Sequence, residues 1–118
     1  MENKVAETIK ILEKLVSFQS ISGTSTREIN NFIVECLMRH GVESVLSYDG
    51  DGERSNVFAT IGPKIDGGVL FNGHTDVVPV EGQKWSTDPF TLTQIEDRLY
   101  GRGSVDMKGF LACALASL

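Results

Sequence analysis

A histidine and an aspartate two residues apart, His74 and Asp76, are the first side chains in this chain whose types and spacing could do chemistry. In extended backbone, side chains two residues apart point to the same side. A metal-bound imidazole commonly donates its second N–H to a carboxylate, which fixes the tautomer and raises the basicity of the ring. The doublet therefore predicts His74 as a metal ligand and Asp76 as a catalytic carboxylate that orients it. A surface histidine beside a turn aspartate has the same spacing, so the doublet alone leaves both interpretations open.

Asp106 is the second candidate for chemistry. It lies in the run GRGSVDMKG at residues 101–109, just before an apolar helical pattern. A carboxylate at this junction could bridge two metal ions, which lie ~3.5–4 Å apart in two-metal hydrolases. Capping of the following helix explains the same position, and this segment by itself favours capping. The paired glycines are a weak signal for a nucleotide, because a third glycine is missing.

Other routes to catalysis find little support in the sequence. The chain contains neither a Gly-x-Ser-x-Gly nucleophile elbow nor a phosphate-binding P-loop. Cys36 and Cys113 both fall in apolar helical patterns, which predicts two buried free thiols rather than a disulfide or a nucleophile. His40 precedes a helix-ending glycine, where the helix dipole favours a cation. The acidic loop at residues 49–60 lacks the glycine and the glutamate that a calcium loop has at its sixth and twelfth positions.

Hydrophobic periodicity indicates the helices that must position the candidate residues. Apolar residues at helical spacing predict one helix over residues 3–18. A second helix begins with a predicted capping box of Ser25 and Glu28 and ends at Gly41, where glycine can take a left-handed conformation. A third helical pattern begins at Met107.

Extended segments are predicted between the helices, at residues 42–48, 56–61, 68–72 and 99–100. The compact apolar run within 68–72 predicts a strand that is buried on both faces. The stretch 74–98 is rich in turn residues, and a loop of this length is uncommon unless it serves a site. Because helices and strands alternate, the expected class is an α/β fold with a layered sheet.

Composition and charge limit the partners of this chain. Its 118 residues are enough for one domain, and 41% apolar and 23% charged residues are ordinary for a globular protein. A net charge of −5 excludes a nucleic-acid partner and attraction to an anionic membrane surface. No apolar run approaches the roughly 20 residues that cross a bilayer, and no signal-peptide pattern is present, so a cytoplasmic location is expected. The last helical pattern reaches the final residue without a cap, which predicts a fragment of a longer protein.

Taken together, three segments resemble the M20 family of zinc-dependent amidohydrolases and peptidases. They are NGHTDVVP at residues 72–79, WSTDPFTLT at 85–93 and LYGRGSVDMKG at 99–109, which follow one another in the family's order and at its spacing. The helix and first strands before them fit the family's opening layout. Within the family the sequence is most similar to the acetylornithine deacetylases, also over NVFATIGP at 56–63. Succinyl-diaminopimelate desuccinylases share most of these motifs.

The resemblance implies a fold and a set of roles for the candidate residues. Residues 1–118 would be the N-terminal part of a zinc-binding catalytic domain of the di-zinc exopeptidase type, a three-layer α/β fold with a mixed sheet flanked by helices. The rest of that domain and a lid and dimerisation domain would lie outside it. His74 would bind one zinc ion, Asp76 would orient His74, and Asp106 would bridge two zinc ions and be followed by a cis peptide bond.

The resemblance also implies an activity. It is zinc-dependent hydrolysis of the linear amide of an N-acyl amino acid, with N2-acetyl-L-ornithine converted to L-ornithine and acetate in arginine biosynthesis, and with cobalt as an alternative metal. The full-length enzyme is expected to be a homodimer. The general-base glutamate and the remaining zinc ligands would lie beyond residue 118, so this piece alone is expected to be inactive. The alternatives are a desuccinylase, aminoacylase or dipeptidase of the same family, and a non-catalytic α/β module.

Overall fold

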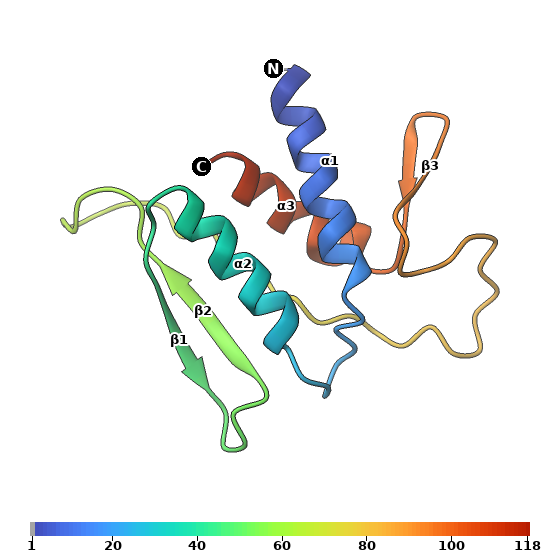
Figure 1. Ribbon diagram of the computed structural model, residues 1–118, viewed down its shortest axis with the longest axis horizontal. Coiled ribbons are helices and arrows are strands. Elements are labelled where there is room, and N and C mark those ends of the chain that lie inside the picture. Colours follow the sequence, from blue (N-terminus) through green and yellow to red (C-terminus); the bar gives the residue numbers. More distant parts are fainter. Residues whose placement is uncertain (1) are drawn as a thin grey trace.

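The computed structural model describes residues 2–118, in which three α-helices are combined with two small hairpins (Figure 1). The helices α1 and α3 lie side by side, α2 lies next to them, and each hairpin projects from a different side of this helical group. In chain order the elements are α1 (Glu2–Ser17), α2 (Arg27–Arg39), β1 (Ser44–Tyr48), β2 (Ser55–Ala59), β3 (Thr93–Ile95), β4 (Arg98–Tyr100), the π-helical segment η1 (Ser104–Lys108) and α3 (Gly109–Ala116).

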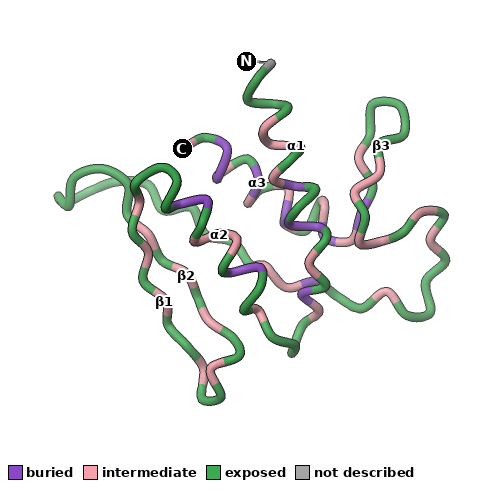
Figure 2. The backbone as a smooth tube through the Cα atoms, viewed as in Figure 1, coloured by how far each residue is buried: buried purple, intermediate pink, exposed green. Residues whose placement is uncertain are grey.

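The hydrophobic core lies where the three helices meet. Leu15 and Val16 of α1 are completely buried and pack with Ile29 of α2 and Ala112 of α3. Burial of a large aliphatic side chain contributes about 1.5–3 kcal/mol, so this cluster holds the helices together. Figure 2 shows the buried positions gathered at this junction, whereas both hairpins carry only intermediate and exposed residues. Among the described residues, no helix has the length and apolar character that a membrane crossing requires.

The start of α2 differs from the predicted capping box. The N-cap residue is Thr26, and neither it nor Glu28 makes a side-chain cap hydrogen bond. The Thr26 hydroxyl instead accepts a hydrogen bond from the backbone N–H of Ser55 at 3.1 Å. The predicted capping box of Ser25 and Glu28 is wrong, because the Ser25 hydroxyl bonds to other groups. It accepts the backbone N–H of Arg27 at 3.3 Å and donates to the carbonyl of Glu53, between β1 and β2, at 3.0 Å. The predicted end is confirmed, since Gly41 follows the helix with a φ of 70°.

The predicted α/β class is confirmed, and the strands of the described residues form two separate antiparallel pairs, β1 with β2 and β3 with β4. The first pair agrees with the predicted extended segments. The strand β3 was not predicted, because it is only three residues long and has a turn-rich neighbourhood. Pairing with β4 stabilises it, with Thr93 opposite Tyr100.

The segment 68–72, predicted as a buried strand, is neither paired nor buried. Its residues belong to no strand, and the side chains of Val69, Leu70 and Phe71 are 84%, 75% and 66% exposed. A strand forms only where a neighbouring strand accepts its backbone hydrogen bonds. Within residues 2–118 no strand pairs with this segment. The apolar run therefore lies unpaired at the surface.

The two cysteines are both free, as predicted. Cys36 of α2 is buried in a cluster that includes Leu115 of α3, and burial raises the pKa of its thiol. Cys113 is exposed, so its predicted burial is wrong. The helix α3 packs on α1 through a different face, which contains Ala112 and Ala116.

Candidate metal centre

His74 and Asp76 lie on an extended segment that is fixed against the linker following α1. The next residue, Val77, donates its backbone N–H to the carbonyl of Ser20 at 2.8 Å. The carbonyl of Val77 accepts the backbone N–H of Ser22 at 2.9 Å. These two bonds hold the backbone of the His74–Asp76 doublet although the apolar run before it is unpaired.

Asp106 lies within η1, at the junction between a glycine turn and α3. Gly103 precedes η1 with a φ of 81°, and Asp106 has non-helical angles of φ −121° and ψ 93°. The bond from Asp106 to Met107 is cis, as the resemblance implied. The Asp106 carboxylate is 84% exposed and bonds to His74, and α3 has no side-chain cap. The capping interpretation of Asp106 is therefore wrong, since the carboxylate faces the other candidate residues.

The three candidate residues form one cluster around the His74 imidazole. Its Nδ1 lies 3.2 Å from Oδ1 of Asp76 and 3.0 Å from the backbone oxygen of Asp76. Its Nε2 lies 2.9 Å from Oδ1 of Asp106. Each ring nitrogen thus faces an oxygen from a different segment of the chain.

The surroundings shift the pKa values of the cluster in opposite directions. Partial burial of the ring lowers the pKa of His74, but the backbone of Asp76 and the carboxylate of Asp106 raise it more, so the pKa lies above its ordinary value. The Ser22 hydroxyl, followed by the charge of His74, lowers the pKa of Asp76. The two carboxylates favour a protonated imidazole, whereas a metal ion needs an unprotonated ring nitrogen. Protons and a metal ion therefore compete for Nε2 of His74.

Ser22 is a part of this cluster that no local sequence pattern singles out. Its hydroxyl donates to Oδ2 of Asp76, the carboxylate oxygen that does not face His74. In the sequence, the residues around Ser22 mark only a break between two helices. The contact joins residues 54 positions apart, so only the packing of the linker against the doublet brings it about.

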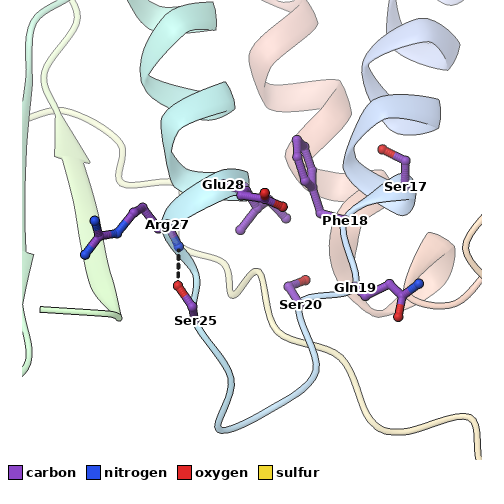
Figure 3. A pocket seen from close by; sticks show the side chains of 8 residues that line it. Ser17, Phe18, Gln19, Ser20, Ser25, Arg27 and Glu28 are labelled. Carbon is purple, nitrogen blue, oxygen red and sulfur yellow. Dashed lines mark hydrogen bonds between the residues drawn. The ribbon is translucent and has the colours of Figure 1, made fainter. Parts of the chain in front are cut away.

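An open pocket of about 270 Å³ lies at the cluster, lined among others by Ser22, His74, Asp76 and Asp106. A larger hollow of about 590 Å³ lies between the end of α1 and the start of α2 (Figure 3). None of the candidate residues lines the larger hollow. In Figure 3 the guanidinium of Arg27 points away from it, and the hydrogen bond drawn there joins the Arg27 backbone to Ser25. The chemistry that the cluster could do therefore belongs to the smaller pocket.

The donors of the cluster fit zinc in chemical type. An imidazole nitrogen and a carboxylate oxygen are both common zinc ligands, and catalytic zinc sites use three protein ligands and keep one position open. In number the donors are too few, since residues 2–118 contain no group of three histidine, cysteine, aspartate or glutamate residues that could hold a metal ion. His74 and Asp106 could thus be part of a zinc site, and other ligands would have to complete it.

Comparisons with known proteins agree with the family that the motifs indicated. Residues 70–118, which contain all three candidate residues, match the model of peptidase family M20/M25/M40. Along its full length the chain is similar to an acetylornithine deacetylase from Shigella sonnei (strain Ss046), with 37% identity over 125 residues. Its fold is similar to the crystal structure of human carnosine dipeptidase 1, with a TM-score of 0.74, 25% identity and 97% of this chain covered. The comparisons confirm the resemblance to the M20 hydrolases that the motifs indicated.

The relatives are much longer than the chain. It spans 32% of the length of the Shigella deacetylase and 29% of the human dipeptidase chain. About two thirds of each relative therefore has no counterpart in these 118 residues.

Proposed function

We propose that this chain is the N-terminal part of the zinc-binding catalytic domain of an amidohydrolase. One observation carries the proposal: the two ring nitrogens of His74 face the carboxylates of Asp76 and Asp106 in an open pocket. The 37% sequence identity with the acetylornithine deacetylase favours N2-acetyl-L-ornithine as the substrate, with L-ornithine and acetate as the products. The same likeness implies a cytoplasmic homodimer that acts in arginine biosynthesis.

In the proposed site each residue has one task. Asp76 holds the Nδ1 side of His74 and thereby fixes the tautomer that leaves Nε2 as a metal ligand. Asp106 offers an exposed carboxylate with two oxygens, which suits a bridging position. Zinc bound by these donors would polarise the amide carbonyl of the substrate and lower the pKa of the attacking water. Before it binds metal, His74 must release its Nε2 contact with Asp106.

The rest of the proposed machinery lies outside these residues. Hydrolysis adds water across the amide C–N bond, so a general base must take a proton from the water and pass it to the leaving amine. We assign that base, the remaining zinc ligands and the lid domain to the part of the relatives that this chain does not span. The 118-residue chain alone is accordingly expected to be inactive and to bind zinc weakly or not at all.

The test uses the protein expressed from the complete gene, stripped of metal by a chelator. We expect hydrolysis of N2-acetyl-L-ornithine to return when zinc or cobalt is added. His74→Ala should reduce the activity by more than about 100-fold, because it removes a metal ligand. Glu13→Gln, on the exposed face of α1, is the matched control and should leave the activity unchanged. Turnover that needs no metal, or turnover by the 118-residue chain alone, would contradict the proposal.

A dipeptidase is the second candidate, and the match to human carnosine dipeptidase 1 favours it. Assays of the same preparation with dipeptides, N-succinyl-diaminopimelate and other N-acyl amino acids separate the members of the family. If the metal-loaded protein hydrolyses dipeptides but not N2-acetyl-L-ornithine, the deacetylase assignment is wrong and the class of reaction stands. If it hydrolyses none of these substrates, a non-catalytic α/β module is the better interpretation.

A further inference from the structure

The Ser22 hydroxyl begins a line of contacts that runs through the whole cluster. It donates to Oδ2 of Asp76 at 2.5 Å, and the other oxygen of that carboxylate lies 3.2 Å from Nδ1 of His74. The opposite nitrogen, Nε2, lies 2.9 Å from Asp106. Because Ser22 engages one oxygen of the carboxylate, it fixes how the second oxygen faces the imidazole.

The position of Ser22 is itself determined by backbone bonds. Its N–H donates to the carbonyl of Val77 at 2.9 Å, and the N–H of Val77 donates to Ser20 at 2.8 Å. The buried hydroxyl of Ser20 donates to the carbonyl of Thr75 at 2.7 Å. The linker is thus joined to the doublet on both sides of Asp76. The Ser22 hydroxyl is placed before any ligand arrives.

Asp76 needs such a partner, because 47% of its side chain is exposed. A carboxylate in that position samples several staggered rotamers unless a hydrogen bond selects one. A bond to a charged acceptor is stronger than one to a neutral carbonyl. The Ser22 hydroxyl is also 3.4 Å from the Val77 carbonyl, but the shorter contact with the charged Asp76 dominates.

We propose that Ser22 is a positioning residue, which holds the Asp76 carboxylate in the one orientation that fixes the His74 imidazole for metal binding. The inference rests on the proposed function for the role of His74. It adds the third segment of the chain, the linker after α1, to a site that the motifs place on only two.

The test compares side-chain order in the metal-free 118-residue chain by NMR. Ser22→Thr keeps the hydroxyl, and Ser22→Val has nearly the same shape without it. We expect the two Hα–Hβ couplings of Asp76 to have the values of a single rotamer in the original protein and in Ser22→Thr. In Ser22→Val and Ser22→Ala both couplings should move to the intermediate values that averaging over several rotamers gives. Thr24→Ala is the matched control, since the Thr24 hydroxyl bonds to the carbonyl of Ile21 in the same linker and not to the carboxylate of Asp76 within residues 2–118.

Two outcomes would overturn the proposal. One is an unchanged pair of Asp76 couplings in Ser22→Val and Ser22→Ala. The other is loss of the backbone amide signals of Val77 and of residue 22 in these variants, because the hydroxyl would then support the backbone of the linker rather than the carboxylate.

The longer enzyme gives an independent measurement. Loss of a group that orients a metal ligand typically lowers metal affinity by 10–100-fold, so Ser22→Val should bind zinc weaker by about that factor and Ser22→Thr should not. If the Asp76 couplings change as expected but the longer protein hydrolyses no amide, the positioning role stands and the proposed function fails. If amide hydrolysis is found and neither the couplings nor the zinc affinity change, the proposed function stands and the positioning role fails.

Discussion

His74 illustrates how much a single side chain depends on residues distant in the sequence. Its two ring nitrogens face Asp76, two positions away, and Asp106, 32 positions away. Carboxylates on both sides raise the pKa of the ring, and they also provide the oxygen donors that a zinc site requires. The same pair of carboxylates therefore favours a proton when metal is absent and supports metal binding when zinc is present.

Lys108 gives a prediction at the scale of one residue. Its side chain is completely buried, and its ammonium donates to the backbone oxygen of Phe18 at 2.9 Å. Burial lowers the pKa of Lys108 from 10.5 to about 8. Between these values the unfolded chain binds more protons than the folded one, so stability should rise with pH from about 8 to 10.5. A shift of this size corresponds to about 3 kcal/mol.

Urea unfolding of the original chain and of Lys108→Met over this pH range is the measurement. Methionine keeps most of the buried volume and does not titrate, so the variant removes the contribution of Lys108 from the pH profile. As pH rises, we expect the free energy of unfolding of the original chain to increase relative to that of the variant. Parallel profiles for the two proteins would contradict the prediction.

At the scale of elements, the turn before η1 depends on Gly103. Its φ of 81° disfavours any residue with a Cβ, and an added Cβ would lie 2.5 Å from Cγ1 of Val77. Gly103→Ala should therefore lower the free energy of unfolding by about 2–4 kcal/mol, which combines the left-handed backbone cost with overpacking. Because Val77 and Asp106 both adjoin this contact, the cluster around His74 should be disturbed as well.

The matched control is Gly82→Ala, at a glycine with a φ of 76° and no atom within 4 Å of an added Cβ. It should lower the free energy of unfolding only by the backbone cost of about 1–2 kcal/mol. Urea unfolding of both variants measures the difference. Equal destabilisation by the two substitutions would show that the contact with Val77 contributes nothing.

At the scale of the whole molecule, the segment 68–72 is an apolar run that the fold leaves exposed and unpaired. Val69, Leu70 and Phe71 are mostly exposed, and their backbone has no strand partner within residues 2–118. Exposed apolar segments with free backbone groups promote self-association. The 118-residue chain should therefore form dimers or larger species as its concentration rises.

Sedimentation velocity at increasing concentration measures this association. Leu70→Lys should shift the chain toward monomer, because it places a charge in the exposed run. Ile65→Lys is the control, since Ile65 is equally exposed, at 74%, but lies outside that run. If the original chain remains monomeric at high concentration, or if both variants reduce association equally, the segment 68–72 is not responsible.

The sequence by itself determined the helices, most of the first hairpin and the identity of the candidate residues. Apolar residues at helical spacing place α1 and α2 within one or two residues, because this periodicity is a local property that one buried face requires. The Gly41 stop and the motifs that contain His74 and Asp106 are local as well. The resemblance carried by those motifs also indicated the cis bond after Asp106, which local physics alone would not predict.

Only the tertiary structure decided what depends on distant partners. It showed that Asp106 bonds to His74 rather than capping α3, that Ser22 bonds to Asp76, and that the Thr26 hydroxyl accepts a backbone N–H of the hairpin rather than one of its own helix. It also left the segment 68–72 exposed, although its composition predicts a buried strand. The type of a side chain determines which groups it can bind. Its actual partner is the group that the folded chain brings within about 3 Å of it.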